Sequence, residues 1–287
     1  FGLQKELLLF LEKTGIPVVS TLLSKSIVRE NHPQYLGVYE GAMGRETVAE
    51  YVETSDCLIM LGAFMTDINL GVFTAHIDQS KTISVTNEKT SIHYHTFEDI
   101  LMKDFFVGLL DSKIKNRKVN LLPHSPIPEK LEPSKGKPMT VEYLFESLNV
   151  FLDDNTMVIA DPGDAMFGSI DMTIHKAAEF MSPAYYTSLG FAVPASIGVQ
   201  TCRPDLRSLV LVGDGSFQMT GMELATVARY KLNPIVIVLN NKGYGTERPM
   251  IDGEFNDVHL WEYSKIPEVL RAGKGFNVKT EDQLEEA

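Results

Sequence analysis

Two short apolar runs dominate the pattern of hydrophobic and polar positions in the second half of the chain. Residues 209–212 and 235–239 contain only Val, Ile and Leu, a composition typical of strands buried on both faces of a sheet. Between them, Thr220 and Glu223 have the spacing of a capping box ahead of an apolar stripe, so we expect a helix to begin at Thr220. A crossover of this length predicts that the two strands are parallel.

Blocks of the same kind occupy the rest of the chain. The pattern predicts alternating elements, with helices at 3–13, 46–54, 97–110 and 140–152 and strands at 16–21, 57–64, 81–86 and 156–160. This alternation is typical of an α/β fold with doubly wound parallel sheets. Residues 123–139 carry five of the fourteen prolines, which predicts a linker between one domain at 1–122 and a second at 140–287.

Composition and charge narrow the function classes. The net charge of −12 argues against the basic face that nucleic-acid binding requires, and no apolar run approaches the roughly 20 residues of a membrane helix. Two cysteines, Cys57 and Cys202, are too few for a disulfide framework and favour a cytoplasmic setting. The chain starts at Phe1 without a signal-peptide pattern. We expect the numbering to begin inside a longer protein and the second domain to be truncated at its C-terminus.

Two motifs in the first domain do not predict a ligand site. Gly37, Gly41 and Gly44 do not match the G-x-G-x-x-G fingerprint of dinucleotide-binding folds. His93 and His95 would share one face of a strand as a possible metal pair, but no cysteine or acidic cluster accompanies them. We therefore expect these histidines to lie in a loop or on the surface.

Polar residues follow three of the predicted strands in the second domain. Asp214 comes just after 209–212, Asn241 just after 235–239, and the sequence DPGD, which ends at Asp164, follows 156–160. Carboxyl ends of parallel strands meet at one sheet edge, where ligands of open α/β folds bind. Carboxylate and amide oxygens suit Mg²⁺, whereas each motif alone could equally be a turn. The pair formed by Asp214 and Asn241 favours a ligand site.

These residues resemble a known enzyme family. Gly213-Asp214-Gly215 followed by Asn241, 27 positions after Asp214, resembles the thiamine diphosphate signature. The segments GDGSFQMT and NNKGYGTE are most similar to 2-keto acid decarboxylases such as pyruvate and indolepyruvate decarboxylase. HPQYLGVYEGAMG, VETSDCLIMLGAF and residues 67–73 resemble the middle domain of the same family. The resemblance implies a Rossmann-like middle domain without cofactor at 1–122 and a thiamine diphosphate-binding domain at 140–287.

The resemblance also implies roles for individual residues. Mg²⁺ would be held by three groups: the side chains of Asp214 and Asn241 and the backbone carbonyl of Gly243. Residues implied to contact thiamine diphosphate are Asp164, Thr187 through its carbonyl, Leu189 as a wedge between the two rings, Gly213, Asp214, Gly215, Ser216, Asn241, Gly243 and Tyr244. Glu247 matches the catalytic glutamate that acts in decarboxylation and proton transfer.

The implied reaction is the non-oxidative decarboxylation of a 2-oxo acid to an aldehyde and CO₂. Ile68 and Met166 lie where pyruvate-specific relatives carry bulky aromatic side chains, which suggests a roomier pocket for indolepyruvate, phenylpyruvate or branched-chain substrates as well as pyruvate. A carboligase of the acetolactate synthase type and a catalytically silent assembly or regulatory module remain alternatives. The family's aminopyrimidine-activating glutamate lies in an N-terminal pyrimidine-binding domain, which we expect a second subunit to supply in a homodimer or homotetramer.

Overall fold

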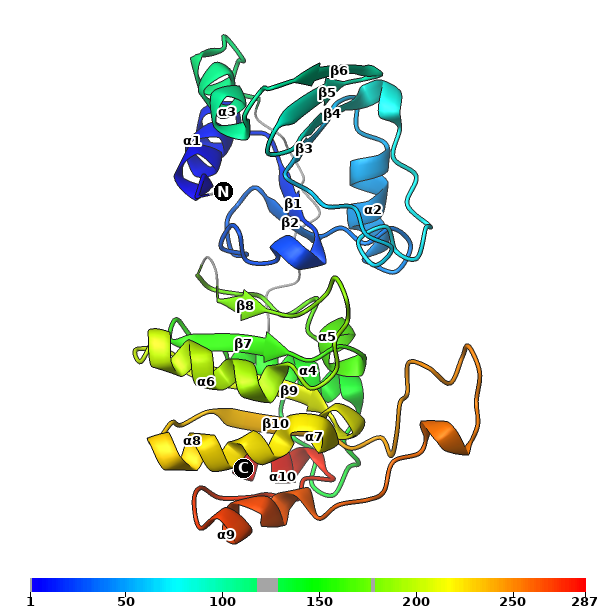
Figure 1. Ribbon diagram of the computed structural model, residues 1–287, viewed down its shortest axis with the longest axis vertical. Helices are drawn as coiled ribbons and strands as arrows, with labels where there is room; N and C mark the ends of the chain where they lie inside the picture. Colours follow the sequence, from blue (N-terminus) through cyan, green and yellow to red (C-terminus); the bar gives the residue numbers. More distant parts are fainter. Residues whose placement is uncertain (1, 118–128, 177–178) are drawn as a thin grey trace. The chain divides into compact units, whose positions relative to one another are not determined.

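The computed structural model describes residues 2–117, 129–176 and 179–287 (Figure 1). The chain forms two compact units, one made of Phe1–Pro126 with Lys176–Ala178 and the other of Ile127–His175 with Glu179–Ala287. Each unit has its own buried hydrophobic core. The first six residues of the predicted linker 123–139, and the predicted end of the first domain at 122, lie outside the described residues.

The first unit is a mixed α/β structure with two small sheets. Strands β1 (Val18–Ser20) and β2 (Tyr35–Val38) form a parallel pair. The second sheet has the order β3-β4-β5-β6, in which only β3 and β4 are parallel. Its strands and the helices of the unit are β3 (Leu58–Leu61), β4 (Thr82–Val85), β5 (Lys89–Ile92), β6 (His95–Glu98), α1 (Gln4–Thr14), α2 (Glu46–Glu53) and α3 (Met102–Asp111).

An antiparallel hairpin in this unit was not predicted by the sequence pattern. Strands β5 and β6 pair with Ile92 opposite His95, so the helix expected from 97 begins only at Met102. His93 and Tyr94 form the exposed tip of the hairpin, and His93 has a φ of 55°. The expected loop or surface position of His93 and His95 is confirmed. Among the described residues, no group of three or more His, Cys, Asp or Glu side chains could hold a metal ion.

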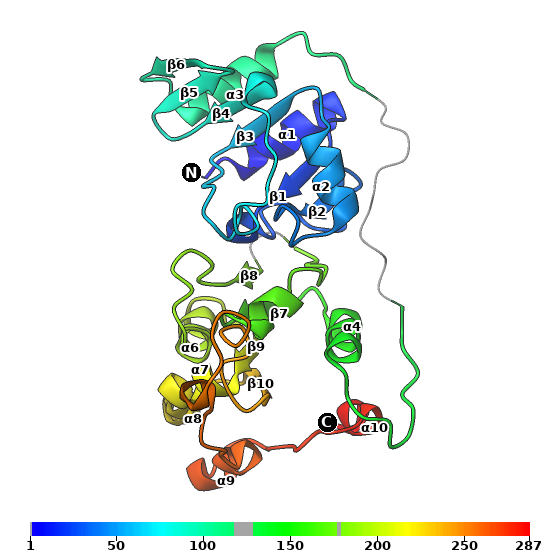
Figure 2. The same ribbon diagram turned by 90° about the vertical axis from the view of Figure 1, so that its right-hand side faces the viewer.

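The second unit contains a four-stranded parallel sheet with the order β10-β9-β7-β8. The predicted α/β fold with parallel strands is thereby confirmed. Helices α6, α7 and α8 lie on one side of the sheet, and α4 and α10 lie on the other (Figure 2). The elements are α4 (Val141–Phe151), β7 (Thr156–Ala160), α5 (Asp164–Gly168), β8 (Phe180–Met181), α6 (Ala192–Cys202), β9 (Arg207–Gly213), α7 (Asp214–Thr220), α8 (Leu224–Tyr230), β10 (Ile235–Leu239), α9 (Ile266–Leu270) and α10 (Glu281–Glu286).

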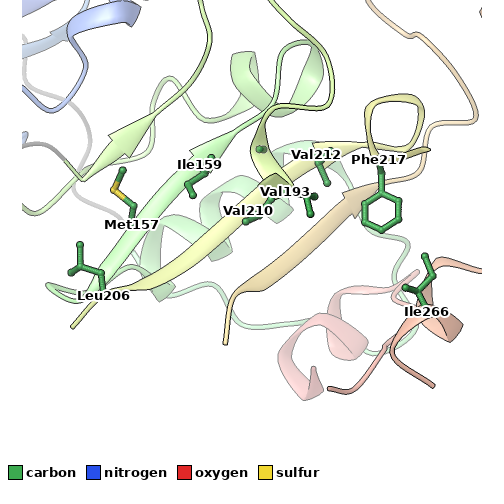
Figure 3. Close-up of a cluster of buried hydrophobic side chains, with 9 residues drawn as sticks. Met157, Ile159, Val193, Leu206, Val210, Val212, Phe217 and Ile266 are labelled. Atoms are coloured by element: carbon green, nitrogen blue, oxygen red, sulfur yellow. The ribbon is translucent and has the colours of Figure 1, made fainter. Parts of the chain in front are cut away.

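The core of this unit explains why its strands were predictable. Val210 and Val212 of β9 and Ile159 of β7 are completely buried and pack with Val193 and Phe217 from the covering helices (Figure 3). A strand with helices on both faces needs apolar side chains at successive positions, so it can be recognised from the local sequence. Across the stretches that the structure covers, every helix is too short or too polar to span a bilayer.

The helix between β9 and β10 differs from the prediction. Helix α7 begins at Asp214, directly after the strand, and ends at Thr220. The Thr220 hydroxyl donates a hydrogen bond to the Gly190 carbonyl (2.7 Å) instead of capping a helix. The predicted capping box at Thr220 and Glu223 was therefore wrong, because a contact with a distant loop replaced the local one.

The C-terminal part of the predicted linker is fastened to the last helix. The Glu281 side chain at the start of α10 is 1% exposed and accepts a hydrogen bond from the Ser134 backbone N–H (3.0 Å). Its carboxylate also lies 2.7 Å from the Lys137 ammonium group, and the Gly136 N–H donates to Asp282. Residues 134–139 thus belong to the structured second unit.

We expect Glu281→Gln to make the chain less stable at neutral pH. The Lys137 ammonium and the Ser134 N–H hold the pKa of Glu281 below its ordinary value, so the folded state resists protonation more than the unfolded state does. This stabilisation is fully present above the ordinary pKa and is lost as the pH falls through the lowered one, below about pH 4. Urea denaturation between pH 3 and 7 should show the gap between wild type and variant closing as the pH falls.

Glu285→Gln is the matched control, since the Glu285 carboxylate is exposed and 3.7 Å from Lys130, where an ion pair contributes little. Equal losses in both variants at pH 7 would contradict the role given to Glu281.

Candidate functional site

The site lies at the carboxyl edge of the parallel sheet in the second unit. Strands β7, β9 and β10 are paired in parallel, so the segments that follow them emerge at one edge. All predicted site residues except Ile68 belong to this unit. Ile68 is half-buried in the first unit, which is a separate compact body.

Asp214 joins the two strand ends that the sequence singled out. Its side chain is fully buried, and its two carboxylate oxygens accept hydrogen bonds from the N–H groups of Gly215 (2.8 Å) and Lys242 (2.6 Å). Burial raises the pKa of the Asp214 carboxyl, while these N–H donors oppose the rise. The bond to Lys242 fixes the segment after β10 to the end of β9.

The Asn241 side chain is oriented by Asp164, which lies in the segment after the third strand, β7. Its side-chain N–H donates a hydrogen bond to the Asp164 carboxylate (2.8 Å) at the start of α5. This bond assigns the amide nitrogen to Asp164 and leaves the amide oxygen of Asn241 available to a ligand. The structure therefore links Asp164 with Asn241, two residues 77 positions apart.

Two glycines allow the segments to approach each other closely. A Cβ atom at Gly215 would lie 2.5 Å from the Tyr244 ring, so only glycine lets that ring rest on the turn after β9. Gly243 has a φ of 152° and would meet the Asn256 carbonyl with any side chain. Tyr244 is held in place by its N–H, which donates to the Asn256 carbonyl (2.9 Å). Ser216 is buried beside this turn in α7.

The expected wedge loop is held by an aspartate that sequence reasoning did not assign. Thr187 adopts a left-handed φ of 48°, and Leu189 is 38% exposed. The buried carboxylate of Asp161 accepts hydrogen bonds from the N–H groups of Gly190 (3.0 Å) and Ala192 (2.7 Å). Asp161 directly follows the buried strand β7, and this position was the one signal that could have separated it from Asp164.

Glu247 occupies an exposed turn. Its N–H donates to the Tyr244 carbonyl, and its own carbonyl accepts from Met250 and Ile251. Among the described residues, the recorded ion pairs of Arg248 join it to Asp252 (2.7 Å) and Asp257 (2.6 Å) and not to Glu247. Among the residues described, the hydrogen bonds recorded for Glu247 are made by its backbone.

Met166 is fully buried in α5.

The residues at the sheet edge fit a magnesium ion bound with a diphosphate. The Asp214 carboxylate, the Asn241 amide oxygen and the Gly243 carbonyl are three hard oxygen donors, and Mg²⁺ favours about six. A diphosphate and water are the kinds of ligand that complete such a partial shell.

Comparison with known proteins identifies two family domains in the chain. Residues 1–103 match the thiamine pyrophosphate enzyme central domain, and residues 165–287 match the thiamine pyrophosphate enzyme C-terminal TPP binding domain. Pyruvate decarboxylase of Aspergillus fumigatus is 33% identical over 287 residues, which cover 96% of this chain and 50% of that protein. Indole-3-pyruvate decarboxylase of Azospirillum brasilense is 32% identical, with 100% of this chain and 53% of that protein covered.

An alpha-keto-acid decarboxylase of Mycolicibacterium paratuberculosis is 31% identical, with coverage of 99% of this chain and 51% of that protein. The chain spans about half the length of the curated relatives it matches.

Proposed function

The chain belongs to the thiamine diphosphate-dependent 2-keto acid decarboxylase family, and from this premise we propose that it serves the non-oxidative decarboxylation of a 2-oxo acid to an aldehyde and CO₂. One observation carries the proposal. The hydrogen bond from the Lys242 N–H to Asp214 brings the ends of β9 and β10 together, so that a carboxylate, an amide and a carbonyl offer oxygens at one sheet edge.

We propose that the residues at this edge hold the metal ion and the diphosphate. The Asp214 carboxylate, the Asn241 amide oxygen and the Gly243 carbonyl hold Mg²⁺, and the hydrogen bond to Asp164 keeps the Asn241 amide in the right orientation. Gly213, Gly215, Ser216 and Tyr244 line the diphosphate. When bound, thiamine diphosphate supplies the electron sink that decarboxylation requires.

The loop of Thr187 and Leu189 faces the rings of the cofactor in the proposal. The Thr187 carbonyl would accept a hydrogen bond from the 4′-amino group of the cofactor, and the Leu189 side chain would pack against its rings. The partial exposure of Leu189 supports this role, since a 38% exposed leucine has a free surface to offer.

Glu247 is the proposed proton-transfer residue. Such a role requires a carboxyl group shielded from bulk water, whereas Glu247 is exposed in this chain. Met250 and Ile251, which follow it, are 73% and 67% exposed, and Phe255 is also exposed. Contiguous exposed apolar side chains mark surfaces that another protein covers. We propose that the pyrimidine-binding domain of a second subunit covers this segment and supplies the glutamate for the aminopyrimidine ring.

The assembly is proposed to be a homodimer or homotetramer. We also propose a cytoplasmic location, which the exposed, unpaired cysteines Cys57 and Cys202 support.

Titration calorimetry with thiamine diphosphate, in Mg²⁺ and in EDTA, tests the cofactor site directly. We expect binding that requires Mg²⁺, and an absence of binding to the assembled protein would favour a silent assembly or regulatory module. Gas chromatography of the products separates the remaining classes, because a decarboxylase releases an aldehyde and a carboligase an acyloin. Turnover by this chain with no added protein would contradict the need for a second-subunit domain.

Turnover measured with different 2-oxo acids tests the proposed substrate pocket. Ile68 and Met166 predict that kcat/KM for phenylpyruvate or indolepyruvate at least equals that for pyruvate, because both side chains are smaller or more adaptable than an aromatic ring. A clear preference for pyruvate would refute the roomier pocket.

A further inference from the structure

Asp161 is a buried carboxylate held by hydrogen bonds and not by an ion pair. Its side chain is fully buried at the end of β7, and the ion pairs recorded among the described residues do not include it. Burying a carboxylate is costly unless donors satisfy its oxygens. The N–H groups of Gly190 and Ala192 donate to one oxygen each, and the Ser216 hydroxyl and the Phe191 N–H lie close enough to lower the pKa of Asp161 against the rise that burial causes.

The partners of Asp161 come from two segments that are distant in sequence. Gly190 and Ala192 belong to the loop that enters α6, whereas the Asp161 backbone N–H donates to the Leu211 carbonyl of β9 (2.8 Å), three residues before Asp214. Asp161 therefore connects three parts of the sheet edge: the end of β7, the loop of Thr187 and Leu189, and the end of β9.

The loop also contains a local hydrogen bond from the Thr187 N–H to the Pro183 carbonyl (2.9 Å). Leu189 is partly exposed, and Thr187 and Gly190 have positive φ values of 48° and 82°. Gly190 is anchored on both sides, since its N–H donates to Asp161 and its carbonyl accepts from the Thr220 hydroxyl. A carboxylate suits this position because it only accepts hydrogen bonds, and all of its neighbours here can donate.

We propose that Asp161 is a positioning residue that holds the loop of Thr187 and Leu189 in register with the end of β9 and Asp214. The inference rests on the proposed function: with thiamine diphosphate bound, this carboxylate sets the distance between the ring-contacting loop and the diphosphate-holding turn. Asp161 touches neither metal nor cofactor in this role.

Hydrogen exchange of the chain without ligand tests the proposal independently of the cofactor. Asp161→Asn replaces one acceptor oxygen by an N–H₂ group that faces backbone donors, so we expect the amides of Gly190 and Ala192 to exchange about tenfold faster. Amides in β9 should exchange as before. Asp153→Asn is the matched control, because Asp153 precedes the opposite end of β7, is exposed and accepts bonds only from Asn155 and Thr156 among the residues described.

Ligand binding gives a second readout. For Asp161→Asn we expect the affinity for thiamine diphosphate with Mg²⁺ to fall about tenfold and the affinity for inorganic pyrophosphate with Mg²⁺ to change less than threefold. The groups assigned to the metal remain in place, whereas the ring-contacting loop does not. Wild-type protein that binds pyrophosphate but not thiamine diphosphate would refute the proposed function and leave the exchange result as the test of loop anchoring.

Two further variants cover the case in which Asp161→Asn does not fold. Thr220→Val removes the other anchor of Gly190 and should raise exchange at Gly190 and Phe191, whereas Asp161→Glu keeps an acceptor-only group and should retain more protection than Asp161→Asn. Unchanged protection at residues 190–192 in Asp161→Asn, or in both Thr220→Val and Asp161→Glu if Asp161→Asn is unfolded, would overturn the proposal.

Discussion

Asp214→Asn is expected to weaken Mg²⁺-dependent binding of thiamine diphosphate by about 100-fold or more. The substitution removes the one formal negative charge among the proposed magnesium ligands, and loss of groups that only support a metal ligand already costs about 10- to 100-fold in metal affinity. It also turns an N–H₂ group toward the backbone N–H of Gly215 or Lys242, both of which now donate to the carboxylate. The segment after β10 would lose its attachment to β9.

Titration calorimetry at fixed Mg²⁺ concentration measures this effect. Asp252→Asn is the control, because Asp252 is exposed and its side chain binds Arg248 in the neighbouring segment. The affinity of this variant for thiamine diphosphate should stay within threefold of wild type. An Asp214→Asn protein that is folded by circular dichroism and binds the cofactor as tightly as wild type would exclude Asp214 as a metal ligand.

Glu247→Gln is expected to lower kcat by about 10²- to 10⁴-fold, the usual contribution of a positioned proton-transfer group. The amide keeps the size of the side chain but cannot exchange a proton. The affinity for thiamine diphosphate should change less than threefold, because the hydrogen bonds recorded for Glu247 within the described part of the chain come from its backbone and leave the Asp214 edge intact.

The assay must use protein in which the second-subunit domain is present, with kcat and cofactor affinity measured on the same preparation. Glu254→Gln is the control, since Glu254 is an exposed glutamate of the same segment and should retain wild-type turnover. Wild-type kcat in Glu247→Gln would rule out a proton-transfer role, and a large loss of cofactor affinity would reassign Glu247 to binding.

The strands of the second unit and the two polar ends could be predicted from the sequence. The apolar runs at 209–212 and 235–239 became β9 and β10 within a residue or two, because a strand with helices on both faces carries apolar side chains at successive positions. Strand β9 is almost entirely buried, whereas the edge strand β10 is half-buried. Asp214 and Asn241 followed from the strand ends, since parallel strands deliver their carboxyl ends to one edge.

Elements that depend on partners distant in sequence could not be predicted from the local pattern. The hairpin of β5 and β6 replaced the start of a predicted helix because 95–98 gained a strand partner in 89–92. Residues 134–139 read as a linker from their proline, lysine and glycine content, yet Glu281 holds them through Ser134 and Lys137. Both cases need a partner that the local sequence window does not contain.

The amino-acid sequence by itself determined the family, the parallel sheet and the residues at the ends of β9 and β10, because these depend on short-range composition and spacing. Only the tertiary structure decided that Thr220 anchors Gly190 instead of capping a helix, and that the Asp161 carboxylate is buried and holds the loop at residues 190–192. A buried carboxylate and an exposed turn have the same local sequence signal. What separates them is the pair of donors that folding brings from residues 190 and 192.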